Sequence, residues 1–179
     1  MAVLTVYFSL KGETIVPGMK IVNLEKGHTA VAIQRAVGGD IFEIETVKTY
    51  IADHMKMIYE AKEELEQGIR PELKSYPNSL DKYDTIFLCY PNWWNTLPMP
   101  VLRFIEHYDW NGKHIIPVNT SEGSGAGKSV AKIREVCKGA TVDERRSHHD
   151  EVMIWNGSDE RTGLHSNRVN TLNREEVSL

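Results

Sequence analysis

The chain has 179 residues, of which 41% are hydrophobic, so it is long enough for one well-buried domain and short for two. Its net charge of −4 comes from acids and bases interspersed along the sequence, which argues against a nucleic-acid partner. The N-terminus lacks the layout of a signal peptide, and no apolar stretch approaches the roughly 20 residues that span a bilayer. We therefore expect a soluble, cytoplasmic protein with no membrane partner. Cys89 and Cys137 have no CxxC spacing, which favours core thiols over a disulfide or a metal site.

Strand-like and helix-like segments alternate along the chain, which is the pattern of an α/β protein with a parallel sheet. Strands are predicted over residues 2–8, 40–45, 85–90 and 114–119, with a weaker fifth near Thr141 or over 152–155. Between them lie four apolar stripes at helical spacing: Ala30, Ile33 and Val37; Ile51, Met55, Ile58, Tyr59 and Leu65; Val101, Phe104, Ile105 and Tyr108; Val130, Ile133 and Cys137. We interpret all four as core packing, and the acidic run 60–66 as the solvated face of a helix.

The loop after the first strand predicts an anion site. It begins Ser9-Leu10-Lys11-Gly12, and a second Lys-Gly-x-Thr occurs at residues 26–29. Residues 13–25 hold β-branched runs about a Pro-Gly turn, which predicts an inserted hairpin. Helix formers follow Thr29, so Thr29 lies at a helix start, where free N–H groups and the helix dipole favour a phosphate. A plain N-cap is the simpler alternative.

The third strand is continuously apolar from Ile86 to Tyr90 and then delivers Pro91 and the adjacent pair Trp93-Trp94. A strand of this kind is buried on both faces, and open parallel sheets bind ligands beyond the carboxyl ends of their strands. Both rings could simply cover helix ends. We expect instead that one ring packs inward and that Trp94 faces a planar ligand.

The loop after the fourth strand nearly matches a phosphate-binding P-loop at residues 123–129, with Gly127-Lys128-Ser129 in place. Glu122 occupies the position of the motif's first glycine, and a carboxylate there would oppose a triphosphate. The alternative is a glycine-rich wall whose backbone reaches the edge of a heterocycle, with hydroxyls from Thr120 and Ser121.

Together, these three loops resemble the flavodoxin-like family of FMN-binding proteins. Ser9 and residues 27–29 match the two ends of the family's Ser-x-Thr-Gly-Asn-Thr loop. Residues 90–100 match Tyr-Pro-x-Trp-Trp-Gly-Thr-x-Pro-x-Pro, except that Asn95 replaces the glycine. Residues 120–125 match a Thr-Ser-x-Gly-Ser-Gly loop, and residues 139–142 match Gly-Ala-Thr-Val.

The resemblance implies a three-layer, doubly wound α/β fold: a five-stranded parallel sheet of order 2-1-3-4-5 with helices on both faces. It also implies that FMN is the cofactor and that the flavin performs the redox chemistry without a catalytic side chain. The implied phosphate contacts are Ser9, Leu10, Lys11, Gly27, His28 and Thr29. The implied ring contacts are Pro91, Asn92, Trp93, Trp94, Asn95 and Thr96 in one loop, and Thr120, Ser121, Glu122, Gly123, Ser124 and Gly125 in the other.

Three functions stay open at this point. The first is an electron carrier that docks on a redox partner protein, and the second is an FMN-dependent reductase of quinones or similar small acceptors. The third is an NTP-binding protein that uses residues 123–129. The chain is expected to be a monomer or a homodimer. His148-His149-Asp150 reads as a surface group and not as a metal site, and the tail 157–179 has no clear pattern.

Overall fold

The computed structural model describes residues 2–10, 28–51, 53–121 and 125–144. The predicted hairpin at 13–25, the His148-His149-Asp150 group, the alternative strand at 152–155 and the tail 157–179 therefore lie outside the described residues.

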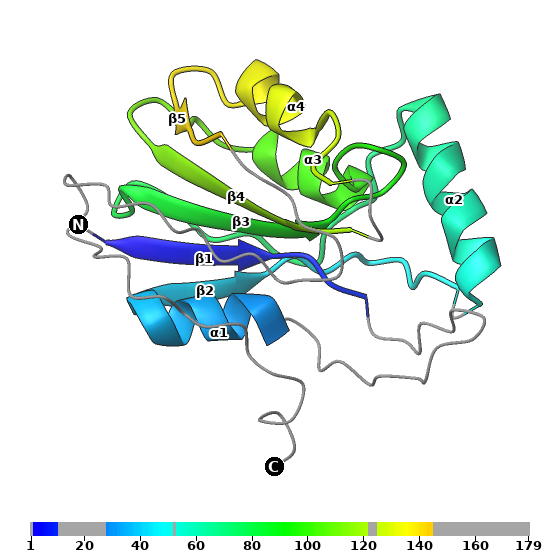
Figure 1. Ribbon diagram of the computed structural model, residues 1–179, viewed down its shortest axis with the longest axis horizontal. Helices are drawn as coiled ribbons and strands as arrows, with labels where there is room; N and C mark the ends of the chain where they lie inside the picture. Colours follow the sequence, from blue (N-terminus) through cyan, green and yellow to red (C-terminus); the bar gives the residue numbers. More distant parts are fainter. Residues whose placement is uncertain (1, 11–27, 52, 122–124, 145–179) are drawn as a thin grey trace, which may run out of the picture.

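Five parallel strands form the centre of the structure (Figure 1). They are β1 (Val3–Tyr7), β2 (Asp40–Glu43), β3 (Thr85–Pro91), β4 (His114–Thr120) and β5 (Thr141–Val142). Their order is β2-β1-β3-β4-β5, which confirms the expected fold class and places the fifth strand at Thr141. β3 lies in the middle, and its residues 85–90 are buried, as a continuously apolar strand requires.

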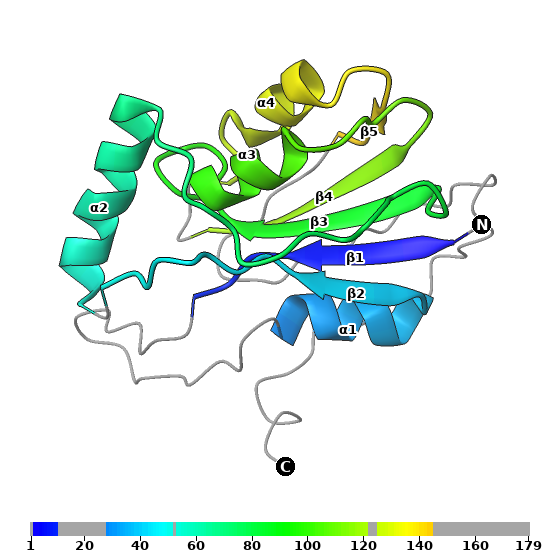
Figure 2. The same ribbon diagram turned by 180° about the vertical axis from the view of Figure 1, so that it is seen from behind.

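Helices cover both faces of this sheet. They are α1 (His28–Val37), α2 (His54–Gln67), α3 (Met99–Ile105) and α4 (Ser129–Val136). α1 lies on one face, and α3 and α4 lie on the other (Figures 1 and 2). α2 lies on neither face: in both views it stands beyond the carboxyl ends of the strands. α2 is therefore a neighbour of the loops in which the sequence predicts a ligand site.

Local chemistry accounts for the ends of α2 and α3. Asp53 caps α2 by accepting a hydrogen bond from the Lys56 N–H at 2.9 Å, and Gly68 closes the helix with φ 66°. α3 begins after Pro98 and ends at Ile105, so the helix is shorter than the stripe through Tyr108 predicts. Tyr108 lies past the helix end and packs against the core from there.

The prediction that the α2 stripe packs into the core is wrong for three of its members. Ile51, Met55 and Tyr59 are 48%, 56% and 61% exposed. The buried side of α2 instead carries Ala61 and Glu64, and Glu64 is only 3% exposed. The physical reason is the position of α2: a helix at the edge of the sheet has no sheet face on which to bury a wide apolar stripe.

The other apolar positions form two clusters, one on each face of the sheet. Ala30 and Ile33 of α1 pack on Phe87, Cys89, Ile116 and Val118, whereas a larger cluster lies under α3 and α4. Both cysteines are buried thiols, as predicted, and burial raises the pKa of Cys137 to about 12. Within the described residues, no helix combines the length and apolar character needed to cross a bilayer.

Candidate functional site

The carboxyl ends of β1, β3 and β4 meet at one edge of the sheet, because these strands are adjacent and parallel. Tyr7 at the end of β1 pairs with Cys89, and Pro91 at the end of β3 pairs with Thr120 at the end of β4. The predicted loops therefore start side by side. This edge is where open α/β sheets bind ligands.

The first loop is described only in part. Ser9 and Leu10 follow β1 and are half-buried, and the Phe8 N–H donates to the Cys89 carbonyl at 3.0 Å. Thr29 is half-buried in the first turn of α1, which begins at His28 and carries no acidic residue in that turn. Lys11 and Gly27 lie outside the described residues, so the implied phosphate contacts are neither assembled nor contradicted.

The tryptophan loop forms a two-residue β-turn. Trp93 and Thr96 form an antiparallel bridge with two backbone hydrogen bonds of 3.1 Å. Trp94 and Asn95 between them have φ 50° and 66°, the pair of left-handed residues that defines a type I′ turn. Asparagine is the residue after glycine that best tolerates this conformation, so Asn95 suits the position where the family has glycine.

The two adjacent indoles have different surroundings, as expected. Trp93 packs edge-on against Phe8 and Tyr50, with ring centroids 5.4 and 5.5 Å apart. Trp94 is 43% exposed. A ligand contact of Trp94 stays a prediction.

One contact of Trp94 could not be read from the sequence. Its indole N–H donates to the carbonyl of Ile58 on α2 at 2.9 Å. The ammonium of Lys62, one turn further along α2, lies over the indole at 5.3 Å from the ring centroid. Thus α2 holds the ring from one side.

A polar network connects the ends of β3 and β4. The side-chain amides of Asn92 and Asn119 both donate to the Gly125 carbonyl, at 2.6 and 3.0 Å, and the Gly125 N–H donates to the Ser121 hydroxyl at 3.0 Å. The Asn92 N–H also donates to the Thr120 carbonyl at 2.7 Å. Asn119 is 6% exposed, and its Oδ1 has no hydrogen-bond partner among the described residues. Sequence reasoning missed Asn119, although a polar residue closing an apolar strand is a usable signal.

The start of α4 clasps the tryptophan turn from the other side. The Lys128 N–H donates to the Asn95 carbonyl at 2.8 Å. Gly127 has φ 53°, and a Cβ there would overlap the side-chain and main-chain oxygens of Asn95. The tryptophan turn and the segment before α4 are therefore joined, next to the two loops that the resemblance assigns to the flavin ring.

The same contacts disfavour a P-loop at residues 123–129. Ser129 is fully buried, donates to the Ala126 carbonyl at 2.6 Å and accepts from the Tyr90 hydroxyl at 2.9 Å. A P-loop needs this hydroxyl for Mg²⁺ and its backbone N–H groups for phosphate. Here the hydroxyl of Ser129 and the N–H of Lys128 are already engaged within the fold.

A buried polar cluster lies behind Trp93. Glu64 of α2 accepts a hydrogen bond from the Tyr50 hydroxyl at 2.9 Å and forms an ion pair with Lys48, which also contacts Glu60 at 2.7 Å. Burial, reinforced by the charge of Glu64, raises the pKa of Tyr50 far above its ordinary value. Burial alone would lower the pKa of Lys48, but the hydrogen bonds to the two glutamates raise it overall. The acidic run on α2 is therefore not a purely solvated face, which corrects the sequence interpretation at Glu64.

Comparison with known families decides the identity of the fold. The sequence profile described as "Flavodoxin" matches residues 3–155. The chain belongs to the flavodoxin family. The match extends from β1 past the end of β5, so it includes every strand and all three loops at the carboxyl edge.

Several solved structures share this flavodoxin fold. Two provisionally assigned flavoproteins, from Bacteroides uniformis and Bacteroides eggerthii, are 30% and 27% identical, and both give a TM-score of 0.65. Each match covers 79% of this chain, and 86% and 84% of the respective relative. A flavoprotein from Lactobacillus acidophilus, solved in complex with FMN, is 21% identical with a TM-score of 0.60, and the match covers 79% of this chain and 89% of that one. No curated protein sequence matches.

The described part of this flavodoxin-family chain holds no group of three or more His, Cys, Asp or Glu that would suit a metal ion. Its candidate site is instead made of one exposed indole, backbone groups, amides and hydroxyls. These groups can stack on a ring and exchange hydrogen bonds with it, but they include no strong nucleophile.

Proposed function

We propose that this flavodoxin-family protein binds FMN non-covalently and transfers electrons through it. The observation that carries the proposal is the Trp94 turn, in which a left-handed pair holds an exposed indole at the carboxyl edge of the sheet. The FMN complex of the Lactobacillus acidophilus flavoprotein, which shares the fold, supports the choice of cofactor. Electron transfer, cytoplasmic location and assembly as a monomer or homodimer are parts of the proposal.

The described residues fit FMN in three respects. An isoalloxazine offers a flat aromatic face, and Trp94 offers an exposed one. Its pyrimidine edge carries both donors and acceptors, and the buried Oδ1 of Asn119 is an acceptor without a donor among the described residues. Its phosphate needs N–H groups and hydroxyls. Ser9 and Leu10 offer them after β1, and Thr29 offers a hydroxyl in the first turn of α1, which lacks acids.

FMN, when bound, supplies the redox chemistry. The protein would contribute binding and orientation: Ser9, the Leu10 backbone and Thr29 hold the phosphate, and Trp94 covers one side of the ring. Thr120, Ser121 and Gly125 line its edge, and the Asn92 and Asn119 amides keep that loop in place. The other implied contacts complete the proposed site: Lys11, Gly27 and His28, residues 122–124, and Pro91, Trp93, Asn95 and Thr96 of the tryptophan loop.

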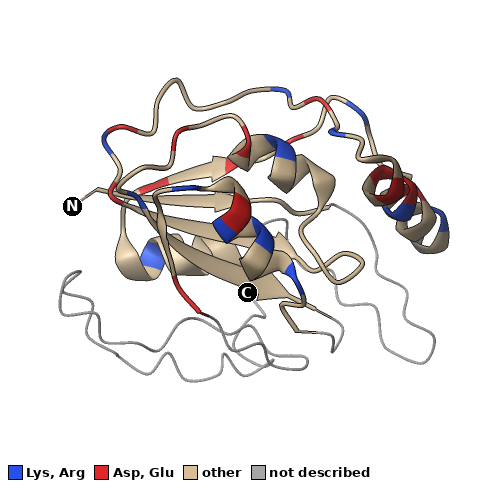
Figure 3. Cartoon of the chain, turned by 90° about the horizontal axis from the view of Figure 1, so that it is seen from above, with Lys and Arg blue, Asp and Glu red and all other residues tan. Residues whose placement is uncertain are grey.

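A reductase of quinones or similar small acceptors is the second candidate. Basic and acidic residues are interspersed along the described elements, α2 included (Figure 3), and the net charge is only −4. Carriers that rely on electrostatic steering present a strong field of one sign. The mild field here favours an acceptor that needs no steering.

An FMN titration of the apoprotein, followed by flavin and tryptophan fluorescence, tests the proposal. Trp94→Ala should weaken binding by about 5- to 150-fold, because stacking on an aromatic side chain is worth about 1–3 kcal/mol. Tyr59→Ala is the matched control, since it removes another exposed aromatic ring, from α2, and should leave the affinity within about twofold. A wild-type protein that binds no FMN would refute the proposal, and binding of ATP instead would restore the P-loop alternative.

The two redox candidates separate in a stopped-flow experiment. The FMN protein is reduced chemically and then mixed with a quinone or with a protein acceptor such as cytochrome c. A reductase reoxidises faster with the quinone, and a carrier reoxidises faster with the protein, with a rate that falls as salt is added.

A further inference from the structure

We infer that α2 is the positioning element for Trp94 and that Lys62 is the residue through which it orients and polarises this ring toward the flavin. The inference rests on the proposed function, because it concerns how the same site holds its cofactor. Neither Lys62 nor α2 belongs to the loops that the family motifs single out.

Two contacts set the plane of the indole. The N–H of Trp94 donates to the Ile58 carbonyl at 2.9 Å, which directs the edge of the ring to the α2 backbone. The Lys62 ammonium lies 5.3 Å from the ring centroid, which assigns one face of the ring to this cation. Because the main chain of Trp94 is held in a type I′ turn, these side-chain contacts decide where the other face points.

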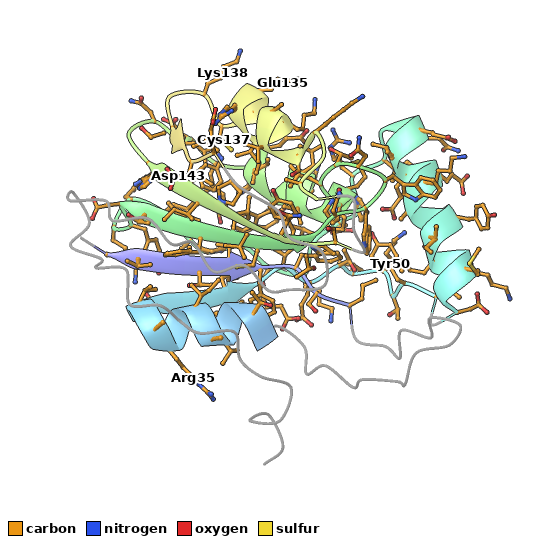
Figure 4. All side chains as sticks on the ribbon, in the orientation of Figure 1. Arg35, Tyr50, Glu135, Cys137, Lys138 and Asp143 are labelled. Carbon is orange, nitrogen blue, oxygen red and sulfur yellow. The ribbon has the colours of Figure 1, made fainter. Side chains whose placement is uncertain are left out.

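The helix that makes these contacts is itself anchored. Glu64, two residues after Lys62, is buried against Lys48 and the Tyr50 hydroxyl. Figure 4 shows Tyr50 at the carboxyl edge of the sheet, on the side of α2. The Tyr50 ring in turn packs on Trp93, with the centroids 5.5 Å apart. Both tryptophans of the turn are therefore connected to α2. Trp93 is connected through Tyr50 and Glu64, and Trp94 through Ile58 and Lys62.

Lys62 covers one face of the Trp94 indole, and the side chain is still partly exposed, so the opposite face is available to an aromatic ligand. Lys62 then lies behind the indole, one ring away from the flavin. A cation there favours the more electron-rich, reduced flavin over the oxidised one. Glu66 is within 3.5 Å of the Lys62 ammonium, but both side chains are exposed, so water screens this pair and the cation is only partly neutralised.

The test combines four substitutions with the FMN titration. Lys62→Ala removes the side chain, Lys62→Met keeps its length without the charge, and Lys62→Arg restores the charge. Lys56→Ala is the matched control, because Lys56 is an exposed lysine of the same helix. Loss of an exposed cation–π contact should raise the Kd for oxidised FMN about two- to fivefold in Lys62→Ala and Lys62→Met. Lys62→Arg and Lys56→Ala should stay within about twofold of wild type.

A second readout separates positioning from a general loss of structure. The midpoint potential of bound FMN should become more negative in Lys62→Met and return toward the wild-type value in Lys62→Arg. The effect on affinity should disappear when the substitutions are made in a Trp94→Leu background, because Lys62 positions the cofactor through the indole. Unchanged affinity and potential in Lys62→Met would overturn the inference, and so would an equal change of affinity in the Trp94→Leu background.

Failure of the proposed function gives a different result. If the wild-type protein binds no FMN, the Lys62–Trp94 contact is measured in the apoprotein by acrylamide quenching, as the difference between each protein and its Trp94→Leu form. Quenching of the Trp94 contribution should increase in Lys62→Ala and not in Lys56→Ala. Equal quenching in all proteins would show that Lys62 does not hold the ring.

Discussion

The buried polar cluster of Glu64, Lys48 and Tyr50 predicts that removing its cation and removing its anion have different effects on stability. Glu64 is 3% exposed and holds both Lys48 and the Tyr50 hydroxyl. Lys48 has a second partner, Glu60, at 2.7 Å, and its side chain is 35% exposed. Removing the cation should therefore have a different effect from removing the buried anion.

In Lys48→Met, the Glu64 carboxylate stays buried without its cation, and breaking a buried pair in this way costs about 3–5 kcal/mol. In Glu64→Leu, the Tyr50 hydroxyl loses a hydrogen bond to a charged group, worth about 1.5–3 kcal/mol. The new apolar side chain offsets about 1–2 kcal/mol of this loss, and Lys48 keeps Glu60 and water. We expect a net cost of about 1 kcal/mol for Glu64→Leu. For Lys48→Met we expect about 3 kcal/mol, the lower end of the range, because Lys48 is partly exposed and water screens its charge.

Urea unfolding at pH 7, followed by far-UV circular dichroism, measures the two free energies. Lys56→Met serves as the control for losing a lysine from this region, and it should change the free energy of unfolding by less than about 0.5 kcal/mol. The double variant Lys48→Met/Glu64→Leu should be more stable than Lys48→Met alone. Additive costs, or a larger cost for Glu64→Leu than for Lys48→Met, would refute the reasoning.

Three further results are expected. Burial raises the pKa of Cys137 from 9.0 to about 12. The buried thiol therefore contributes stability below pH 9 that is lost as the pH rises toward 12, by up to about 1.4 kcal/mol per pH unit. In urea unfolding from pH 8 to 11, the free energy of unfolding should decline less steeply in Cys137→Ala than in wild type, and equal slopes would contradict this. Gly127→Ala should lower the free energy of unfolding by about 2 kcal/mol because its Cβ meets Asn95, and Asn95→Gly should relieve part of that loss; a thermal melt that does not move would mean that the clasp is absent. Asn119→Ala removes one of the two amides that hold the Gly125 carbonyl and should raise the FMN Kd by about fivefold in a fluorescence titration, whereas an unchanged Kd would exclude it from the site.

The parallel sheet and the central place of β3 follow from features that the sequence displays directly, whereas the strand order came from the family resemblance. Residues 86–90 are apolar throughout, and a strand with no polar position belongs in the middle of a covered sheet, where β3 lies. The different surroundings of the two indoles were also predictable, because adjacent side chains tend to point in different directions. The left-handed geometry at Trp94 and Asn95 was not, since asparagine at one of the two positions is a weak turn signal.

The placement of α2 could not be predicted, and the reason lies in its pattern. Met55 and Tyr59 suit a buried helical stripe as well as Ala61 does, so hydrophobic spacing alone selects the wrong face. The buried face carries instead the tertiary ion pair between Lys48 and Glu64, residues that are 16 positions apart and that read singly as surface charges. The contact of Trp94 with Ile58 depends on which face of α2 is buried, and for that reason it too was missed.

The two faces of the sheet are packed against buried clusters of different size, which affects where the protein opens locally. Among the residues that the structure describes, the buried cluster on the α1 side is small and takes Ala30 and Ile33 from the helix, whereas the opposite face holds the larger cluster. Elements with few buried contacts open locally at a lower free energy than the whole domain. Amide protons of α1 should thus exchange with solvent before those of β3. Because Thr29 lies in the first turn of α1, a phosphate bound there would stabilise the helix and slow that exchange. The exchange rate of the α1 amides would then report whether the phosphate site is occupied.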